Sequence, residues 1–187
     1  MNTNFEEKTM KVVCYGDSNT FGYDPRSYFG ERYPADCRWV DILAAKTGWE
    51  IHNNGMNGRE IPRKETVFPR SVDLLIVMLG TNDLLQGSSV DMVSNRMESF
   101  LSGLSIEKEK ILLVAPPPMK YGEWVPDQRL IESSVQLAKC YHALSTSLGI
   151  RFADAGKWNV STAFDGVHFT EDGHKAFAEG LLKEIDK

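Results

Sequence analysis

The sequence predicts an α/β protein built on a mostly parallel β-sheet with helices on both faces. Two continuous apolar runs, at 73–79 and 110–115, lack the polar alternation of a half-exposed strand. Such runs are typical of strands buried on both faces of a parallel sheet. Segments with helical spacing of apolar residues alternate with these strands along the chain. For five strands we expect a flavodoxin-like order, which is common among doubly wound sheets.

The expected elements begin at residue 11. Strands are predicted at 11–15, 49–52, 73–79, 110–115 and 150–153. Between the second and third strands, residues 53–58 are rich in Asn and Gly and predict a turn. Helices are predicted from Trp39 to a C-capping Gly48, over 90–104, over 128–148 before Gly149, and from an N-capping Thr170 onward.

Composition narrows the classes of function. The 187 residues are enough for one domain, which we expect over 1–187 with residues 1–10 as a flexible N-terminal extension. The net charge is −5 and no Lys/Arg cluster offers a phosphate-binding stripe, so we expect no nucleic-acid partner. No stretch approaches the ~20 apolar residues that span a bilayer, and we expect no membrane partner. Three cysteines without C-x-x-C spacing favour a reducing, cytoplasmic setting.

Reactive side chains gather where the predicted strands end. Ser18 follows the first strand, Gly58 the second and Asn82 the third, while Asp165 and His168 follow the last. Parallel strands place their carboxyl ends at one edge of the sheet, which is where open α/β sheets bind ligands. These five residues are therefore expected to meet.

Their residue types fit nucleophilic catalysis. A serine hydroxyl is a weak nucleophile and needs an adjacent base, for which His168 has a suitable pKa range. The imidazole in turn needs a carboxylate, here Asp165, to hold one ring nitrogen as a donor. Attack by Ser18 on an ester carbonyl creates an oxyanion. The expected oxyanion donors are the Ser18 and Gly58 N–H groups and the Asn82 side chain.

Four sequence blocks in this order resemble the SGNH hydrolases, also called the GDSL esterase/lipase family. The blocks are Gly-Asp-Ser-Asn at 16–19, Gly58, Gly-Thr-Asn-Asp at 80–83, and Asp165-x-x-His168. The resemblance implies a three-layer α/β/α fold and ester hydrolysis by Ser18, Asp165 and His168 without a metal or cofactor. Thr20-x-Gly22 and Arg38-Trp39 are similar to the arylesterase/acyltransferase branch, which implies short-chain acyl esters.

Several assignments stay open at this stage. Gly55 competes with Gly58 as the oxyanion glycine, and we favour Gly58. Asp17 is expected to hold the turn around Ser18, with a substrate contact as the alternative. Tyr23 and Trp158 are divided between packing and substrate binding. Asn19 is expected to be the least constrained residue of its block.

The predicted function is a serine hydrolase that cleaves or transfers the acyl group of a small carboxylic ester. Carbohydrate O-deacetylase, thioesterase and lysophospholipase activities would use the same centre. A metal-dependent phosphohydrolase built on Asp17, Asp83 and Asp165 is a weaker alternative, because it leaves His168 and Asn82 without a role. A non-catalytic binding module is also less favoured, because a binder needs no nucleophile, base, acid or oxyanion donor. Exposed loop aromatics are compatible with a homo-oligomer.

Overall fold

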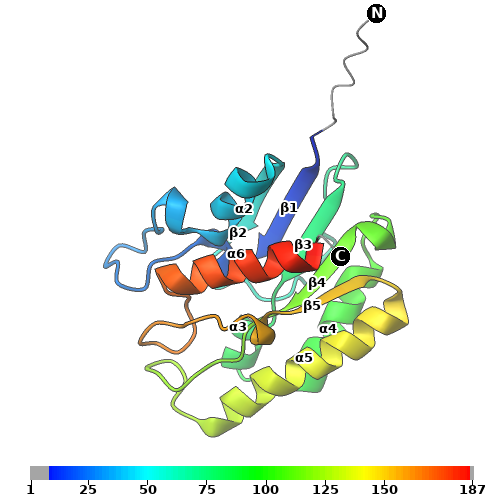
Figure 1. Cartoon of the computed structure of the whole chain (residues 1–187). Coiled ribbons are helices and arrows are strands. Elements are labelled where there is room, and N and C mark those ends of the chain that lie inside the picture. The colour runs from blue at the N-terminus through cyan, green and yellow to red at the C-terminus, as the bar shows by residue number, and fades with distance from the viewer. Residues whose placement is uncertain (1–8, 186–187) are drawn as a thin grey trace, which may run out of the picture.

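The computed structural model describes residues 9–185 and contains a five-stranded sheet in the order β2-β1-β3-β4-β5. Every pair of neighbouring strands is parallel, which confirms the predicted flavodoxin-like order (Figure 1). The strands are β1 (Lys11–Gly16), β2 (Glu50–Gly55), β3 (Leu74–Met78), β4 (Ile111–Ala115) and β5 (Arg151–Asp154).

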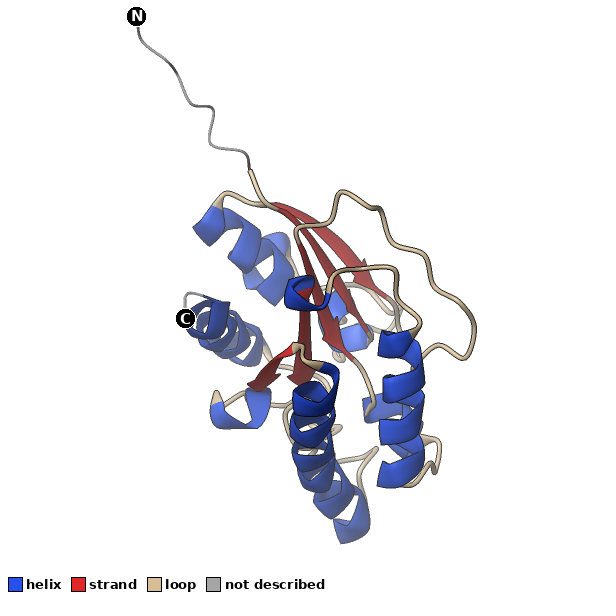
Figure 2. Ribbon diagram, turned by 90° about the vertical axis from the view of Figure 1, so that its right-hand side faces the viewer, coloured by secondary structure: helices blue, strands red, loops and turns tan. Residues whose placement is uncertain are grey.

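Helices cover both faces of the sheet, as Figure 2 shows. The α-helices are α1 (Ser18–Phe21), α2 (Trp39–Thr47), α3 (Thr81–Leu85), α4 (Val90–Ser102), α5 (Gln128–Leu148) and α6 (Glu171–Ile185). The pair α4 and α5 packs on one face, and the pair α2 and α6 packs on the other. The predicted three-layer α/β/α arrangement is confirmed.

Two hydrophobic cores lie on opposite faces of the sheet. Side chains alternate along each strand, so Val13 and Leu75 enter the core under α4 and α5, while Val12 and Leu74 enter the core under α2 and α6. All five residues of β3 and of β4 are buried. Burial on both faces is the physical reason that these strands read as continuous apolar runs.

The second strand is longer than predicted. We expected a turn at 53–58, but β2 continues to Gly55, and Asn53 pairs with Cys14 of β1. The Asn53 amide donates to the Thr20 carbonyl at 2.9 Å and accepts from the Gly55 N–H at 2.9 Å. This polar side chain is therefore anchored within the strand, and the turn begins only after Gly55.

The ends of the longer helices follow the predicted caps. Gly48 and Gly149 both adopt the left-handed conformation that closes α2 and α5. The Thr170 hydroxyl accepts from the Gly173 N–H at 3.0 Å, as an N-cap does. The short helices α1 and α3 were not predicted, because four or five residues give no periodicity to read.

The predicted N-terminal extension lies mostly outside the described residues. Met10 is an exception, because its carbonyl accepts the Glu50 N–H at 3.0 Å and its side chain packs against the core under α2. Residue 10 therefore belongs to the fold.

We predict that Gly55→Ala destabilises the protein. A Cβ at this position would lie 2.0 Å from the Phe21 backbone nitrogen, so α1 or β2 would have to move. Overpacking typically costs about 1–3 kcal/mol, which a denaturant unfolding curve would resolve. Gly103→Ala is the matched control, because its Cβ would meet no atom closer than 3.4 Å. Equal stability of the two variants would contradict the close approach of α1 to β2.

Candidate active site

The hydroxyl of Ser18 begins a chain of hydrogen bonds through an imidazole to a carboxylate. Ser18 Oγ lies 2.9 Å from His168 Nε2, and His168 Nδ1 lies 2.7 Å from Asp165 Oδ2. An ionised carboxylate only accepts, so Nδ1 carries the proton and Nε2 is left to accept from the serine. All three residues are buried. The structure thus brings together the three residues proposed as nucleophile, base and acid.

Ser18 is held at the tip of β1 by a very short helix. Asp17 caps α1 by accepting the Asn19 N–H at 3.0 Å, and Gly22 ends the helix in a left-handed conformation. The turn is tight, because a Cβ on Gly16 would lie 2.0 Å from the Thr20 hydroxyl oxygen. Ser18 is the first residue of α1, so its N–H has no acceptor within the helix. That N–H is free to face a substrate.

The Asp165 carboxylate is organised by the backbone of its own loop. Its Oδ1 accepts the N–H groups of Val167 at 2.8 Å and His168 at 2.9 Å, while its other oxygen meets the imidazole. Burial opposes ionisation, but the His168 side chain and these two N–H groups outweigh it and lower the pKa of Asp165. The carboxylate therefore stays ionised at neutral pH.

The loop carrying this pair is supported by the segment after β4. The Trp124 N–H donates to the Asp165 carbonyl at 3.1 Å, and the Lys120 N–H donates to the Gly166 carbonyl at 3.0 Å. Glycines permit the approach, because a Cβ on Gly122 would lie 2.3 Å from the Asp165 carbonyl carbon. Sequence reasoning missed this segment, since nothing local shows that residues 120–124 contact the loop at 165–166.

Aromatic rings flank the imidazole. The centroid of the Tyr23 ring lies 4.6 Å from that of His168, and the half-exposed Trp124 ring meets the imidazole edge-on at 4.9 Å. Tyr23 was one of the tentative substrate contacts, and its position beside the imidazole is compatible with that role. Trp124 was not anticipated.

The ring contact of Trp158 is with α6 and not with His168, which counts against its tentative substrate contact. Its ring packs against α6, with its centroid 5.0 Å from that of Phe177. A Cβ on Gly180 would lie only 2.2 Å from the indole. The physical reason is that an apolar indole next to a glycine on a helix fills the space that the missing side chain leaves. Trp158 is a packing residue in this structure.

The two remaining oxyanion candidates are joined through Arg59. The Asn82 side-chain amide donates to the Arg59 carbonyl at 3.1 Å, which leaves its second N–H free, and Gly58 directly precedes Arg59. The Arg59 guanidinium donates to the Gly16 carbonyl at 3.0 Å and to the Asn54 carbonyl. Arg59 thereby links the loop after β2 to the end of β1, two residues before Ser18.

The two glycines that competed for the oxyanion position differ clearly in their surroundings. Gly55 is part of β2 and packs against the α1 backbone. Gly58 is exposed, has a φ of 71°, and would have no atom within 4 Å of an added Cβ. Gly58 is therefore the more open of the two glycines, and Gly55 is enclosed by the backbone of α1.

The carboxylates of the alternative metal site have separate partners. Asp83 is fully buried, and it accepts from the Ile61 N–H at 3.0 Å and pairs with Arg96 at 3.0 Å. Asp17 caps α1 and Asp165 holds His168. Among residues 9–185, no group of three or more His, Cys, Asp or Glu side chains is arranged to hold a metal ion.

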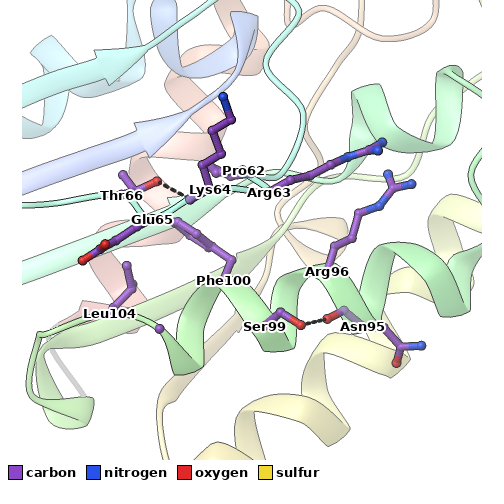
Figure 3. A pocket seen from close by; sticks show the side chains of 11 residues that line it. Pro62, Arg63, Lys64, Glu65, Thr66, Asn95, Arg96, Ser99, Phe100 and Leu104 are labelled. Atoms are coloured by element: carbon purple, nitrogen blue, oxygen red, sulfur yellow. Dashed lines mark hydrogen bonds between the residues drawn. The ribbon is translucent and has the colours of Figure 1, made fainter.

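A groove of about 610 Å³ lies between residues 62–66 and the C-terminal half of α4 (Figure 3). Two of its three cationic side chains are paired, because Arg96 pairs with Asp83 and Glu60, and Arg63 pairs with Glu60. None of the proposed catalytic residues lines it. The groove is therefore separate from the Ser18, His168 and Asp165 side chains.

Comparisons with known proteins identify the family of this chain. Residues 14–176 match the model of the GDSL-like lipase/acylhydrolase family, and the chain belongs to that family. It is accordingly a hydrolase that acts on ester bonds. No curated protein matches the chain.

Solved structures resemble almost the whole chain. A putative arylesterase from Agrobacterium tumefaciens is 28% identical with a TM-score of 0.79, and the match covers 95% of this chain and 99% of that one. The aryl esterase of M. smegmatis is 27% identical with a TM-score of 0.76, at 95% and 99% coverage. A carbohydrate acetylesterase family member from Sinorhizobium meliloti is 24% identical with a TM-score of 0.78, at 95% and 97% coverage, and shows the shared fold.

We predict that Asp17→Asn stabilises the protein at neutral pH. Burial raises the pKa of Asp17 to about 6, so between pH 4 and 6 the native state binds more protons than the unfolded state. The contribution of the Asp17 carboxyl to the free energy of unfolding therefore falls as the pH rises from 4 to 6, and it stays low above pH 6. Asparagine keeps the capping oxygen without the charge and recovers up to about 3 kcal/mol at pH 7.

The measurement is urea unfolding of both proteins at pH 4 and pH 7. The gain should be large at pH 7 and small at pH 4. A variant that is less stable than the wild type at pH 7 would show that the Asp17 charge stabilises the fold.

Proposed function

We propose that the chain cleaves short-chain carboxylic esters through an acyl-Ser18 intermediate. The observation that carries the proposal is the continuous set of hydrogen bonds from Ser18 through His168 to Asp165. A binding module has no use for such an arrangement. A phosphohydrolase built on carboxylates would not need an imidazole within 2.9 Å of a serine hydroxyl.

The first half-reaction forms the acyl-enzyme. Ser18 Oγ attacks the ester carbonyl carbon while His168 Nε2 takes the hydroxyl proton. The resulting imidazolium is stabilised by the Asp165 carboxylate. His168 then gives the proton to the alcohol oxygen as the C–O bond breaks, and the alcohol leaves.

The second half-reaction regenerates Ser18. Water attacks the acyl carbon and passes a proton to His168, and the carboxylic acid leaves as Ser18 regains that proton. An alcohol in place of water would give acyl transfer by the same steps. In both half-reactions the oxyanion is held by the N–H groups of Ser18 and Gly58 and by Asn82.

Tyr23 and Trp124 support an alcohol site beside the base. The leaving oxygen must lie near His168 Nε2 to receive its proton, so the rest of the alcohol lies near the rings that flank the imidazole. Half-exposed aromatic rings offer a flat surface for an aryl group or the apolar face of a sugar ring. The two solved relatives named as aryl esterases are consistent with such an alcohol.

We further expect the enzyme to act on small-molecule esters in the cytoplasm. All three cysteines are free thiols, as a reducing compartment would keep them. No described helix is long and apolar enough to cross a membrane. The exposed Tyr28 and Phe29 rings on one loop are compatible with contacts in a homo-oligomer.

We predict that Ser18→Ala abolishes labelling by a fluorophosphonate probe, which phosphonylates an activated serine oxygen and releases fluoride. The variant should fold, because the change removes one hydroxyl. Labelling is followed by intact mass, and circular dichroism checks the fold. An equally labelled alanine variant would remove Ser18 from the mechanism.

We predict that activity falls steeply as the acyl chain of aryl esters lengthens from two to eight carbons.

Trp124→Ala should raise KM for aryl acetates roughly tenfold while leaving kcat within about threefold, because the ring binds the alcohol and takes no part in proton transfer. Initial rates over a chain-length series, with and without an acceptor alcohol, test both points. Tyr121→Ala, which changes another exposed aromatic ring of the same segment, is the control.

A further inference from the structure

We propose that Asn19 is a positioning residue that holds His168 against Ser18. The inference rests on the proposed function, since it concerns the same base and nucleophile. It also reverses our expectation from the sequence, in which Asn19 was the least constrained residue of its block. The side chain of Asn19 is buried and reaches the loop that carries the imidazole, 150 residues further along the chain.

The Asn19 amide bonds to the residues on both sides of His168. Its Nδ2 donates to the Val167 carbonyl at 3.1 Å, and its Oδ1 accepts the Phe169 N–H at 2.9 Å. One side chain therefore fixes the backbone immediately before and after the imidazole. Both backbone groups are buried and would otherwise need another partner.

Asn19 is itself held firmly on the side of the nucleophile. Its N–H donates to Asp17 Oδ1 at 3.0 Å, and its carbonyl accepts the Trp39 indole N–H at 2.9 Å. The Trp39 ring is buried against Phe177 of α6, with 4.8 Å between the ring centroids. Asn19 is thus anchored to the turn and to the core, and its side chain carries that anchoring to the base.

Asp165 and Asn19 hold His168 through different groups and have different tasks. Asp165 bonds to the imidazole and to the N–H groups at 167 and 168, which sets the tautomer and the ring. Asn19 directly follows Ser18 and bonds to the groups at 167 and 169 that Asp165 leaves free. The distance between Oγ and Nε2 is therefore set through Asn19, from the nucleophile to the base.

The chemistry requires an amide at this position. Asparagine offers one donor and one acceptor at the end of a short side chain, matching a carbonyl and an N–H. Leucine has neither group, and aspartate keeps the acceptor but turns a second oxygen toward the Val167 carbonyl. Loss of the brace leaves the substrate's binding groups untouched, so the expected effect is on kcat and on acylation rather than on KM.

The test measures kcat, KM and the fluorophosphonate labelling rate for Asn19→Leu and Asn19→Asp on a short-chain aryl ester. Displacement of a catalytic group by about 1 Å can cost ~10²-fold in rate, so we expect kcat and labelling to fall about 10²-fold with KM within about threefold. Asn19→Asp keeps nearly the same shape and serves if the leucine variant does not fold.

Asn53→Leu is the matched control. Asn53 is likewise an asparagine whose amide makes two backbone hydrogen bonds, although it is only partly buried; its partners are Thr20 and Gly55, and it makes no bond to residues 165–169. Its thermal midpoint should fall by a similar amount, while kcat stays within about threefold of wild type. Equal losses of kcat in the two asparagine-to-leucine variants would overturn the inference, because the effect would then follow stability alone.

Ser18→Ala separates this inference from the proposed function. If the alanine variant retains turnover and labelling, the nucleophile assignment fails. If it is inactive while folded Asn19 variants turn over at the wild-type rate, the function stands and the positioning role of Asn19 is wrong.

Discussion

The hydrogen bond between Ser18 and His168 joins residues 150 positions apart in the sequence. The fold must therefore bring the end of the first strand and the loop before the last helix to the same place. A parallel sheet is suited to this, because all of its strands end at the same edge. Ser18 follows β1, which lies between β2 and β3, and the loop of His168 returns over that edge after the terminal strand β5. The sheet alone brings these segments to the same region, and hydrogen bonds from side chains bring them to 2.9 Å.

Three buried aspartates near this edge show how their surroundings divide the tasks. Burial raises the pKa of Asp17 and of Asp83, whereas hydrogen bonds from His168 and its loop lower that of Asp165 against the effect of burial. Asp17 caps a helix through one side-chain oxygen and Asp83 pairs with Arg96, so both have structural contacts, although the buried charge of Asp17 lowers stability at neutral pH. Asp165 faces an imidazole and is the one suited to stabilise a positive charge there.

The sequence was sufficient to predict that five strands exist, and it named Ser18, His168 and Asp165, which the structure places within hydrogen-bond distance of one another. Strands β3 and β4 were readable because burial on both faces produces an uninterrupted apolar run. Ser18, Asp165 and His168 could be proposed from the sequence because their residue types and their order along the chain resemble the sequence blocks of a known family. The length of β2 could not be predicted, because Asn and Gly at 53–55 indicate a turn by residue type. These residues form part of the strand only because they pair with β1.

The residues that were missed have roles that depend on distant contacts. Trp124 meets His168 only because glycines at 122 and 166 let two loops pass closely, and Arg59 matters because its guanidinium reaches the carbonyl of Gly16. Asn19 is the clearest example, because no feature of residues 16–22 indicates a bond to Val167 or Phe169. The sequence pattern alone gives no reason to constrain the residue that follows the serine. That residue is nevertheless strongly constrained when its side chain completes the backbone hydrogen bonds around the base.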